Sequence, residues 1–119
     1  MSQHFFNLHD LRQGIARQLS EGLETRIFPG DNVMISVVRV APGKAGDLHA
    51  HPEEQWGVLL EGGGVRTQDG RDHPVGAGDF WQTPGGVAHS FRAGPDGAVV
   101  LDIFSPPREE YRKAGRGFA

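Results

Sequence analysis

Residues 43–55 read GKAGDLHAHPEEQ and place two histidines, His49 and His51, one residue apart. In an extended strand, side chains at positions i and i+2 lie on the same face, so the two imidazoles converge on one point. Gln55 has the same parity, and Pro52 permits a bend between them. Neutral imidazole is the commonest metal-binding side chain, and an amide oxygen can complete the coordination of a divalent ion. This stretch therefore predicts a divalent metal site.

Two other interpretations of this stretch stay open. His-x-His alone also occurs in exposed loops, and polar residues flank it here. If Pro52 shifts the register of the strand, Glu53 or Glu54 would replace Gln55 as a ligand. Without such a shift, Glu54 has the opposite parity to the histidines and points away from them.

Length and composition narrow the class of protein. The 119 residues predict one compact domain, residues 1–119, and 18 glycines with 8 prolines favour short strands joined by tight turns. The absence of cysteine excludes disulfides, thiolate-bound zinc and cysteine catalysis. A net charge of −3 argues against a nucleic-acid or anionic-lipid partner. Since no signal-peptide pattern or long apolar run is present, we expect no membrane association and a cytoplasmic location.

Alternating polarity and turn signals predict an all-β fold. The expected strands are Thr25–Phe28, Val33–Val40, His49–Leu60, Val65–Thr67, Arg71–Val75, Asp79–Thr83, Ala88–Arg92 and Ala98–Ser105. The expected turns between them include 29–32, 62–64, 69–70, 84–86 and 94–97. Strands this short, with turns about every eight to twelve residues, are typical of a sandwich or a closed barrel.

Both ends of the chain carry helical signals. Leu8, Leu11, Ile15 and Leu19 recur at helical spacing and predict a short N-terminal helix. Near the other end, Ser105 followed by proline predicts a single helical turn.

A third histidine completes a recognisable pattern. Residues 78–89 read GDFWQTPGGVAH, in which a strand and a Pro-Gly-Gly turn lead to His89. The two stretches resemble the paired motifs of the cupin superfamily, whose fold is a double-stranded β-helix, or jelly-roll barrel. The first motif is matched by Gly43, His49, His51, Gln55 and Gly62, and the second by Gly78, Pro84, Gly86 and His89. The resemblance covers about residues 33–104, which we take as the core of the cupin domain.

The resemblance implies that His49, His51, Gln55 and His89 are the metal ligands. Many cupins have Glu where this chain has Gln55, so the site carries about one negative charge less. We expect weaker metal binding, a stronger Lewis acid and a non-redox role. Three imidazoles and an amide oxygen suit nickel, zinc, manganese or iron.

The segment 99–111, VVLDIFSPPREEY, resembles the ending of small single-domain cupins related to the pectin-degradation protein KdgF. That family converts a 4,5-unsaturated uronate into an open-chain keto sugar, and its implicated residues match Asp102, Phe104 and Arg108. Asp102 and Phe104 share parity, so both can face into a barrel, and an Asp in an apolar strand is expected to have a shifted pKa. Arg108 could pair with a substrate carboxylate. Alternatively, Asp102 pairs with an arginine or caps a strand end, and Arg108 lies in solvent or at an interface.

We therefore predict a metal-dependent enzyme that acts on a sugar acid, with Asp102 as the general acid or base. The alternatives are a small-ligand-binding cupin without turnover and a metal-dependent dioxygenase. Gly57 should lie on the ligand-bearing face and leaves space where a polar side chain could hold substrate, which weakens the match to a uronate. The resemblance also implies a homodimer that exchanges an N-terminal strand within residues 24–40. The remaining histidines, His4, His9 and His73, are expected at the surface, and Phe91 and Trp81 in the core or pocket wall.

Overall fold

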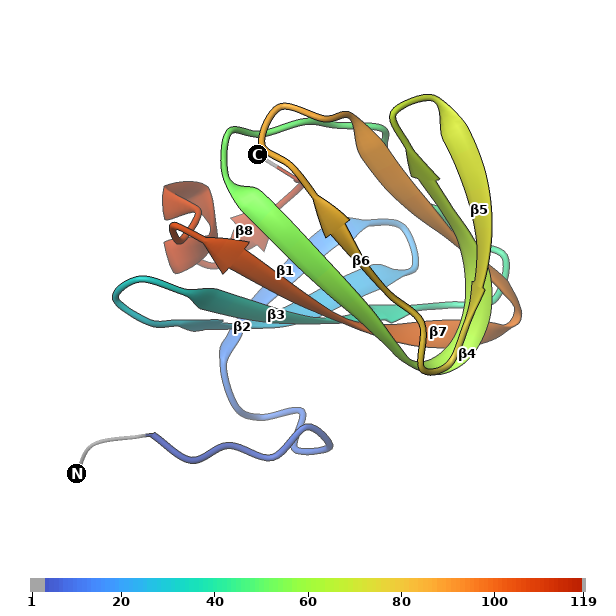
Figure 1. The fold of residues 1–119 in the computed structure, drawn as a ribbon. Coiled ribbons are helices and arrows are strands. Elements are labelled where there is room, and N and C mark those ends of the chain that lie inside the picture. Colours follow the sequence, from blue (N-terminus) through green and yellow to red (C-terminus); the bar gives the residue numbers. More distant parts are fainter. Residues whose placement is uncertain (1–3, 119) are drawn as a thin grey trace.

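The computed structural model describes residues 4–118, which form one strongly curved sheet that folds back on itself (Figure 1). The strands are β1 (Ile15–Ser20), β2 (Leu23–Pro29), β3 (Met34–Val40), β4 (Glu54–Gln68), β5 (Arg71–Gly76), β6 (Phe80–Thr83), β7 (His89–Ser105) and β8 (Gly115–Arg116). A 3₁₀ turn, η1 (Glu109–Arg112), precedes β8. The strand order is β5-β4-β7-β3-β2-β1-β8, with β6 also paired to β4. All pairs are antiparallel except β1 with β8.

Two long strands, β4 and β7, close the barrel because each runs through both of its halves. In one half, residues 54–62 pair with 98–105, and in the other, residues 64–68 pair with 89–93. Between these two blocks, residues 94–97 of β7 face Gly63 alone, and such a bulge bends the strands. The two halves of the barrel are thus joined through the continuous backbones of β4 and β7.

The inward-facing residues of the strands fill the barrel. On β3 every second residue from Met34 to Val40 is buried, which is the period of two expected for strands, and Val37 is also buried, on the outer face beside the groove lined by Phe6 and Leu8. The core consists of Leu19, Leu23, Ile27, Met34, Val38, Val40, Leu59, Phe91, Ala93, Ala98, Val100, Phe104 and Tyr111. Phe91 therefore lies in the core as expected, and Trp81 packs against it.

The predicted N-terminal helix is wrong. Leu8 and Leu11 lie in an irregular segment, whereas Ile15 and Leu19 belong to β1. Gly14 has φ +81°, and a Cβ there would lie 2.9 Å from the Phe28 ring, so the chain turns sharply before β1 begins. Ile15 and Leu19 fit a helical spacing, but they belong to a strand in which alternate residues, Arg17 and Leu19, are buried.

Four boundaries also differ from the expected ones. The glycines 62–64 and the segment 94–97 lie inside β4 and β7 and not in turns between strands. The strand expected from His49 begins only at Glu54. The turn near the end of the chain starts at Glu109, and its N-cap residue, Arg108, makes no side-chain capping hydrogen bond.

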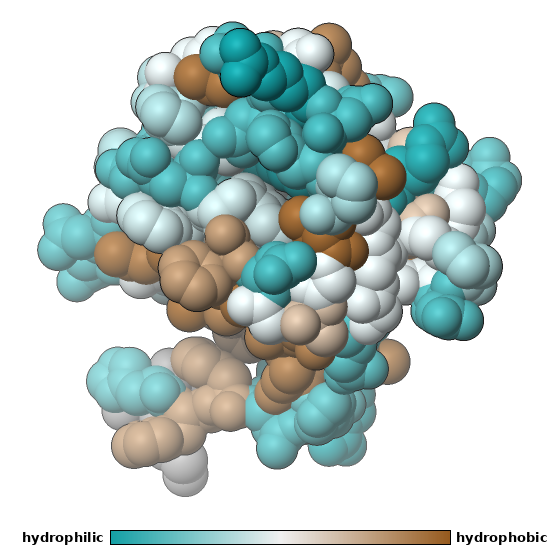
Figure 2. Space-filling view, turned by 45° about the vertical axis from the view of Figure 1, so that its right-hand side comes forward, coloured by the Kyte–Doolittle hydropathy of each residue, from teal (hydrophilic) through white to brown (hydrophobic). Residues whose placement is uncertain are grey.

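The outer face of the barrel carries an apolar groove beside the N-terminal segment. Phe6 and Leu8 form one side of the groove, and Val33, Ile35 and Leu101 lie among its other lining residues. Figure 2 shows hydrophobic side chains gathered on the lower part of this view, near the projecting N-terminal segment. Among residues 4–118 there is no helix whose length and apolar character would let it cross a membrane.

The neighbouring glycines Gly63 and Gly64 give a matched test of this strand geometry. A Cβ at Gly64 would lie 2.2 Å from the Arg92 carbonyl oxygen, whereas one at Gly63 would approach only the Val75 carbonyl oxygen, at 3.4 Å. We expect Gly64→Ala to lower the free energy of unfolding by more than about 2 kcal/mol, because the backbone must move. Gly63→Ala should cost less than about 1 kcal/mol. Chemical denaturation of both variants checks this, and equal stabilities would contradict the described register.

Candidate metal centre

Backbone pairing brings His49 and His89 together. His49 donates its amide to the His89 carbonyl oxygen at 3.1 Å, and His89 donates to the His49 carbonyl oxygen at 2.9 Å. This isolated antiparallel bridge joins the β3–β4 connection to the start of β7. The two imidazole rings consequently lie 4.4 Å apart, centroid to centroid.

The Pro-Gly-Gly turn holds His51 in place. Gly86, with φ +84°, donates its amide to the His51 carbonyl oxygen at 2.8 Å. A Cβ at Gly85 would lie 2.2 Å from the Pro52 carbonyl oxygen, so only glycine permits this approach. The turn that precedes His89 therefore packs directly on the loop that carries His51.

Each imidazole is oriented by a hydrogen bond from Nδ1 to a backbone carbonyl oxygen. The acceptors are Asp47 for His49 at 2.8 Å, Glu53 for His51 at 3.1 Å, and Val87 for His89 at 2.8 Å. Because a carbonyl oxygen only accepts, each Nδ1 carries the proton and each Nε2 presents a lone pair. Such bonds fix the tautomer and orientation of metal-binding histidines.

Burial keeps the three rings neutral. It lowers the pKa of His49 to about 4, and the positive charges of Arg108 and Arg66 lower it further. Burial and the nearby Arg66 lower the pKa of His89 to about 3, and burial and Arg108 lower that of His51. Neutral imidazole is the form that binds a metal, so at neutral pH no proton competes for these lone pairs.

Donor atoms of the three rings lie within 4.8 Å of one another, close enough to converge on one cation. His89 Nε2 is buried and has no hydrogen-bond partner in the described part of the chain. Gln55 Oε1 lies 2.9 Å from His51 Nε2, so two electron-pair donors face each other. Two ligands at right angles around one cation, with bonds of about 2.1 Å, lie about 3 Å apart. The residues therefore fit a divalent metal.

Gln55, and not a glutamate, lies beside the three imidazoles. Glu54 points outward and accepts hydrogen bonds from Trp56 Nε1 at 2.9 Å and Gln82 Nε2 at 3.0 Å. Glu53 Oε1 lies 3.4 Å from His51 Nδ1, the nitrogen already bonded to a carbonyl oxygen. Pro52 thus does not shift the register in favour of either carboxylate.

Asp102 and Phe104 face the cavity beside these ligands, as their parity predicted. The Gln55 amide donates a hydrogen bond to Asp102, which directs Gln55 Oε1 toward His51. Asp102 Oδ1 is buried and has no hydrogen-bond partner within residues 4–118. Burial raises the pKa of Asp102 to about 6, although the positive charge of Arg66 opposes the shift.

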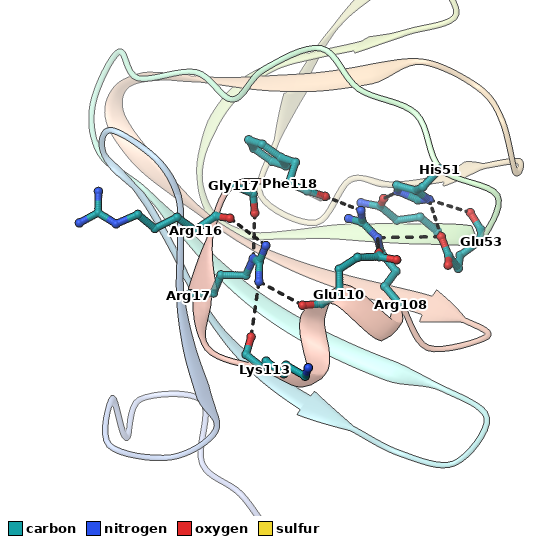
Figure 3. Close-up of polar contacts among 10 residues, drawn as sticks. Arg17, His51, Glu53, Arg108, Glu110, Lys113, Arg116, Gly117 and Phe118 are labelled. Carbon is teal, nitrogen blue, oxygen red and sulfur yellow. Dashed lines mark hydrogen bonds and ion pairs between the residues drawn. The ribbon is translucent and has the colours of Figure 1, made fainter.

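Arg108 lies against the site and is only 2% exposed, which excludes the solvent-exposed alternative. Its guanidinium packs 4.2 Å from the Tyr111 ring centroid, and Nη2 donates to the Phe118 carbonyl oxygen. Figure 3 shows this side chain between Phe118 and Glu53, whose Oε1 lies 3.9 Å from Arg108 Nε. Nη1 is buried and has no hydrogen-bond partner among the described residues.

Residues 36–104 match the Cupin domain family, which is more than half of the chain. The chain is a cupin. It is 34% identical over 97 residues to the oxalate decarboxylase OxdC of Bacillus subtilis and 35% identical over 73 residues to the dimethylsulfoniopropionate lyase DddW of Ruegeria pomeroyi. These matches cover 76% and 61% of this cupin but only 24% and 47% of the two curated relatives.

Solved structures support the same family. An RmlC-like cupin from Shewanella frigidimarina superposes with a TM-score of 0.80 at 28% identity, covering 92% of this chain and 96% of that one. KdgF from Halomonas sp. superposes with a TM-score of 0.79 over 92% and 98% of the two chains, and at 22% identity this likeness shows the fold alone. A structure of the Bacillus subtilis oxalate decarboxylase studied for its Mn(II) centres superposes with a TM-score of 0.73 at 27% identity, covering 88% of this chain and 30% of that one.

Sequence reasoning missed Arg66 in this cupin. Arg66 is 5% exposed, lines the metal-side cavity, and donates to Thr83 Oγ1 at 2.9 Å. Its guanidinium carbon lies 5.5 Å from the Trp81 ring centroid, and Trp81 in turn occupies the space that the missing Gly57 side chain leaves. Gly57 therefore makes room for an indole ring and not for substrate. Parity counted from Gln55 points Arg66 outward, and the register shifts of β4 between Leu59 and Gly64 turn it inward, so no local pattern marks it.

Replacing any one of the three histidines by alanine should abolish stoichiometric binding of a divalent metal. We expect the affinity to fall by more than about 100-fold, because loss of a residue that merely orients a ligand already costs about 10- to 100-fold. His73→Ala is the matched control, since His73 is exposed and outside the cluster. Calorimetric titration of tag-free protein with Ni²⁺ or Mn²⁺ measures the effect, and unchanged binding in all three variants would exclude this site.

Proposed function

We propose that this cupin is a metal-dependent, non-redox enzyme that acts on a sugar acid, with a 4,5-unsaturated uronate as the substrate class to test. The observation that carries the proposal is the Asp102 carboxyl group, whose Oδ1 is buried, has no hydrogen-bond partner within residues 4–118 and lies in one cavity with His49 and His89. A bound divalent metal would supply Lewis-acid polarisation of a substrate oxygen. His49, His51, His89 and Gln55 would hold it.

Asp102 is suited to move a proton near neutral pH. With a pKa of about 6, its carboxyl group populates both protonation states close to physiological pH. Its oxygen Oδ1 is free to donate a proton to the substrate or to accept one from it, while the rest of the group orients Gln55. The chain thus provides the proton transfer that hydration of the ring double bond or ring opening needs.

Two buried arginines supply positive charge for a substrate carboxylate. Arg66 lines the cavity, and Arg108 lies against the site with Nη1 unpartnered among the described residues. A guanidinium can bind a carboxylate through two parallel hydrogen bonds and stays charged when buried. These two residues would orient the acid group of the substrate.

With unsaturated galacturonate, the metal-loaded protein should accelerate the loss of the conjugated absorbance. Asp102→Asn should lower kcat by at least about 100-fold, because general acid–base catalysis contributes roughly that much or more. Metal content should stay near that of the wild type. Asp72→Asn is the control, since Asp72 is exposed and contacts only Thr67 in the hydrogen bonds of this hairpin.

Three outcomes separate this proposal from its alternatives. If the metal-loaded protein gives no acceleration over the spontaneous reaction, the uronate is not its substrate. If Asp102→Asn changes ligand affinity only modestly and no product forms with any of a panel of uronates, the protein is a binding cupin. Oxygen consumption by the iron-loaded protein would instead indicate a dioxygenase, which the neutral ligand set disfavours.

A small dicarboxylate is a second candidate substrate, because the cavity is small. Its volume is about 40 Å³, which is room for about two or three water molecules and not for a sugar. The likeness to an oxalate decarboxylase points in the same direction. Incubation with oxalate and detection of formate and carbon dioxide tests it against the uronate.

The expected homodimer stays a prediction, and the apolar groove on β2 and β3 is the surface that a second copy would cover. Phe5 is 93% exposed and Val33 is 43% exposed beside this groove, an arrangement that favours burial by a partner. Sedimentation velocity should give twice the monomer mass, and Val33→Glu should shift it to the monomer. A monomeric wild-type protein at micromolar concentration would contradict the prediction.

A further inference from the structure

The segment that follows η1, residues 113–118, reaches the metal-side cavity with Phe118, which is one of the lining residues; we call this segment the strap. Arg116 pairs with Gln18 of β1, and Gly117 donates its amide to the Gln18 carbonyl oxygen at 2.9 Å. Phe118, at the far end of this segment, lines the cavity together with His49 and His89. The strap is therefore attached to the barrel at its base and ends beside the candidate ligands.

The buried guanidinium of Arg17 holds the strap through several hydrogen bonds. Arg17 Nε donates to the Gly117 carbonyl oxygen and Nη2 to that of Arg116, both at 2.8 Å. Nη1 donates to the carbonyl oxygens of Glu110 at 3.1 Å and Lys113 at 3.4 Å (Figure 3). These charge-assisted bonds fold the strap back so that Phe118 projects toward the site.

The Phe118 ring packs against the His49 ring. Its ring centroid lies 4.3 Å from that of His49 at an angle of 33°, and the ring lines the cavity. A Cβ at Gly46 would lie 2.6 Å from Phe118 Cζ, so the absent side chain at Gly46 is what seats this ring. Gly46 does not have a positive φ, which leaves this packing as the reason for glycine there.

The backbone of Phe118 contacts a second residue of the site, Arg108. Its carbonyl oxygen accepts a hydrogen bond from Arg108 Nη2, one of the groups to which the proposed function assigns the substrate carboxylate. The ring therefore narrows the approach to the metal ligands while the carbonyl oxygen takes a position suited to a carboxylate oxygen. A ligand of only a few atoms fits the remaining 40 Å³, whereas a larger acid must displace Phe118.

We infer that Phe118 is the specificity-determining residue of this site: its ring and carbonyl oxygen exclude large carboxylates from the metal until the strap moves. The inference rests on the metal site of the proposed function, and it holds whichever acid is turned over. It also explains how a cavity too small for a sugar could become large enough to admit a sugar. Release of the strap would enlarge the cavity and free Arg108 in one movement.

The test uses Co²⁺-loaded protein, whose visible spectrum reports ligand binding without turnover, and two probes, formate and saturated D-galacturonate. Phe118→Ala should tighten galacturonate binding by about tenfold or more, because a steric block is removed, and change formate binding by less than about threefold. Gly46→Ala should act in the same direction, since the added Cβ displaces the same ring. Phe80→Ala is the control, because Phe80 is an exposed phenylalanine that does not line this cavity.

If Phe118→Ala and Gly46→Ala leave the affinities for both probes at the wild-type values, the inference is wrong. A second readout needs no metal: the rate at which diethyl pyrocarbonate modifies His49, measured by peptide mass spectrometry relative to exposed His73. Both variants should speed modification of His49 several-fold, and unchanged rates would overturn the inference even in a protein that binds no cobalt. Since galacturonate lacks the reactive double bond, a failure of the uronate assay leaves these results unaffected.

Discussion

The site depends on two backbone hydrogen bonds between His49 and His89, which join segments 40 residues apart in sequence. They place the His89 imidazole opposite that of His49. The Pro-Gly-Gly turn, which docks on the His51 carbonyl oxygen, brings the His51 imidazole to the same place. Both contacts are main-chain interactions, so they hold the rings in position before any ligand arrives. Preorganisation of this kind reduces the ordering cost that a metal or substrate would otherwise have to meet.

The electrostatics of the cavity follow from the same closure of the barrel. Burial favours neutral imidazoles and a protonated Asp102, while Arg66 and Arg108 add fixed positive charge. Three imidazoles and the Gln55 amide are all neutral, so a divalent ion bound by them would keep its charge for Asp102 or an anionic ligand to balance. The strap meets this positive charge, because the Phe118 carbonyl oxygen accepts a hydrogen bond from Arg108, whose Nε lies near the Glu53 carboxylate.

The spacing of the two motifs was enough to predict the cupin family, the all-β fold and the grouping of His49, His51 and His89, because strand parity and glycine-dependent turns are local properties. Parity also placed Asp102 and Phe104 on the inner face. The N-terminal helix failed because the spacing of Ile15 and Leu19 suits a strand once Gly14 turns the chain. The roles of Arg17, Arg66 and Phe118 arise from contacts between residues up to 100 positions apart, and no local pattern marks them.

The most direct test of the account is a crystal structure of tag-free protein grown with Mn²⁺, with anomalous scattering recorded to locate the metal. The account predicts one peak inside the barrel, within about 2.0–2.3 Å of Nε2 of His49, His51 and His89 and of Gln55 Oε1. A peak coordinated by Glu53 or Glu54, or a fully ordered barrel interior without any peak at saturating Mn²⁺, would contradict it.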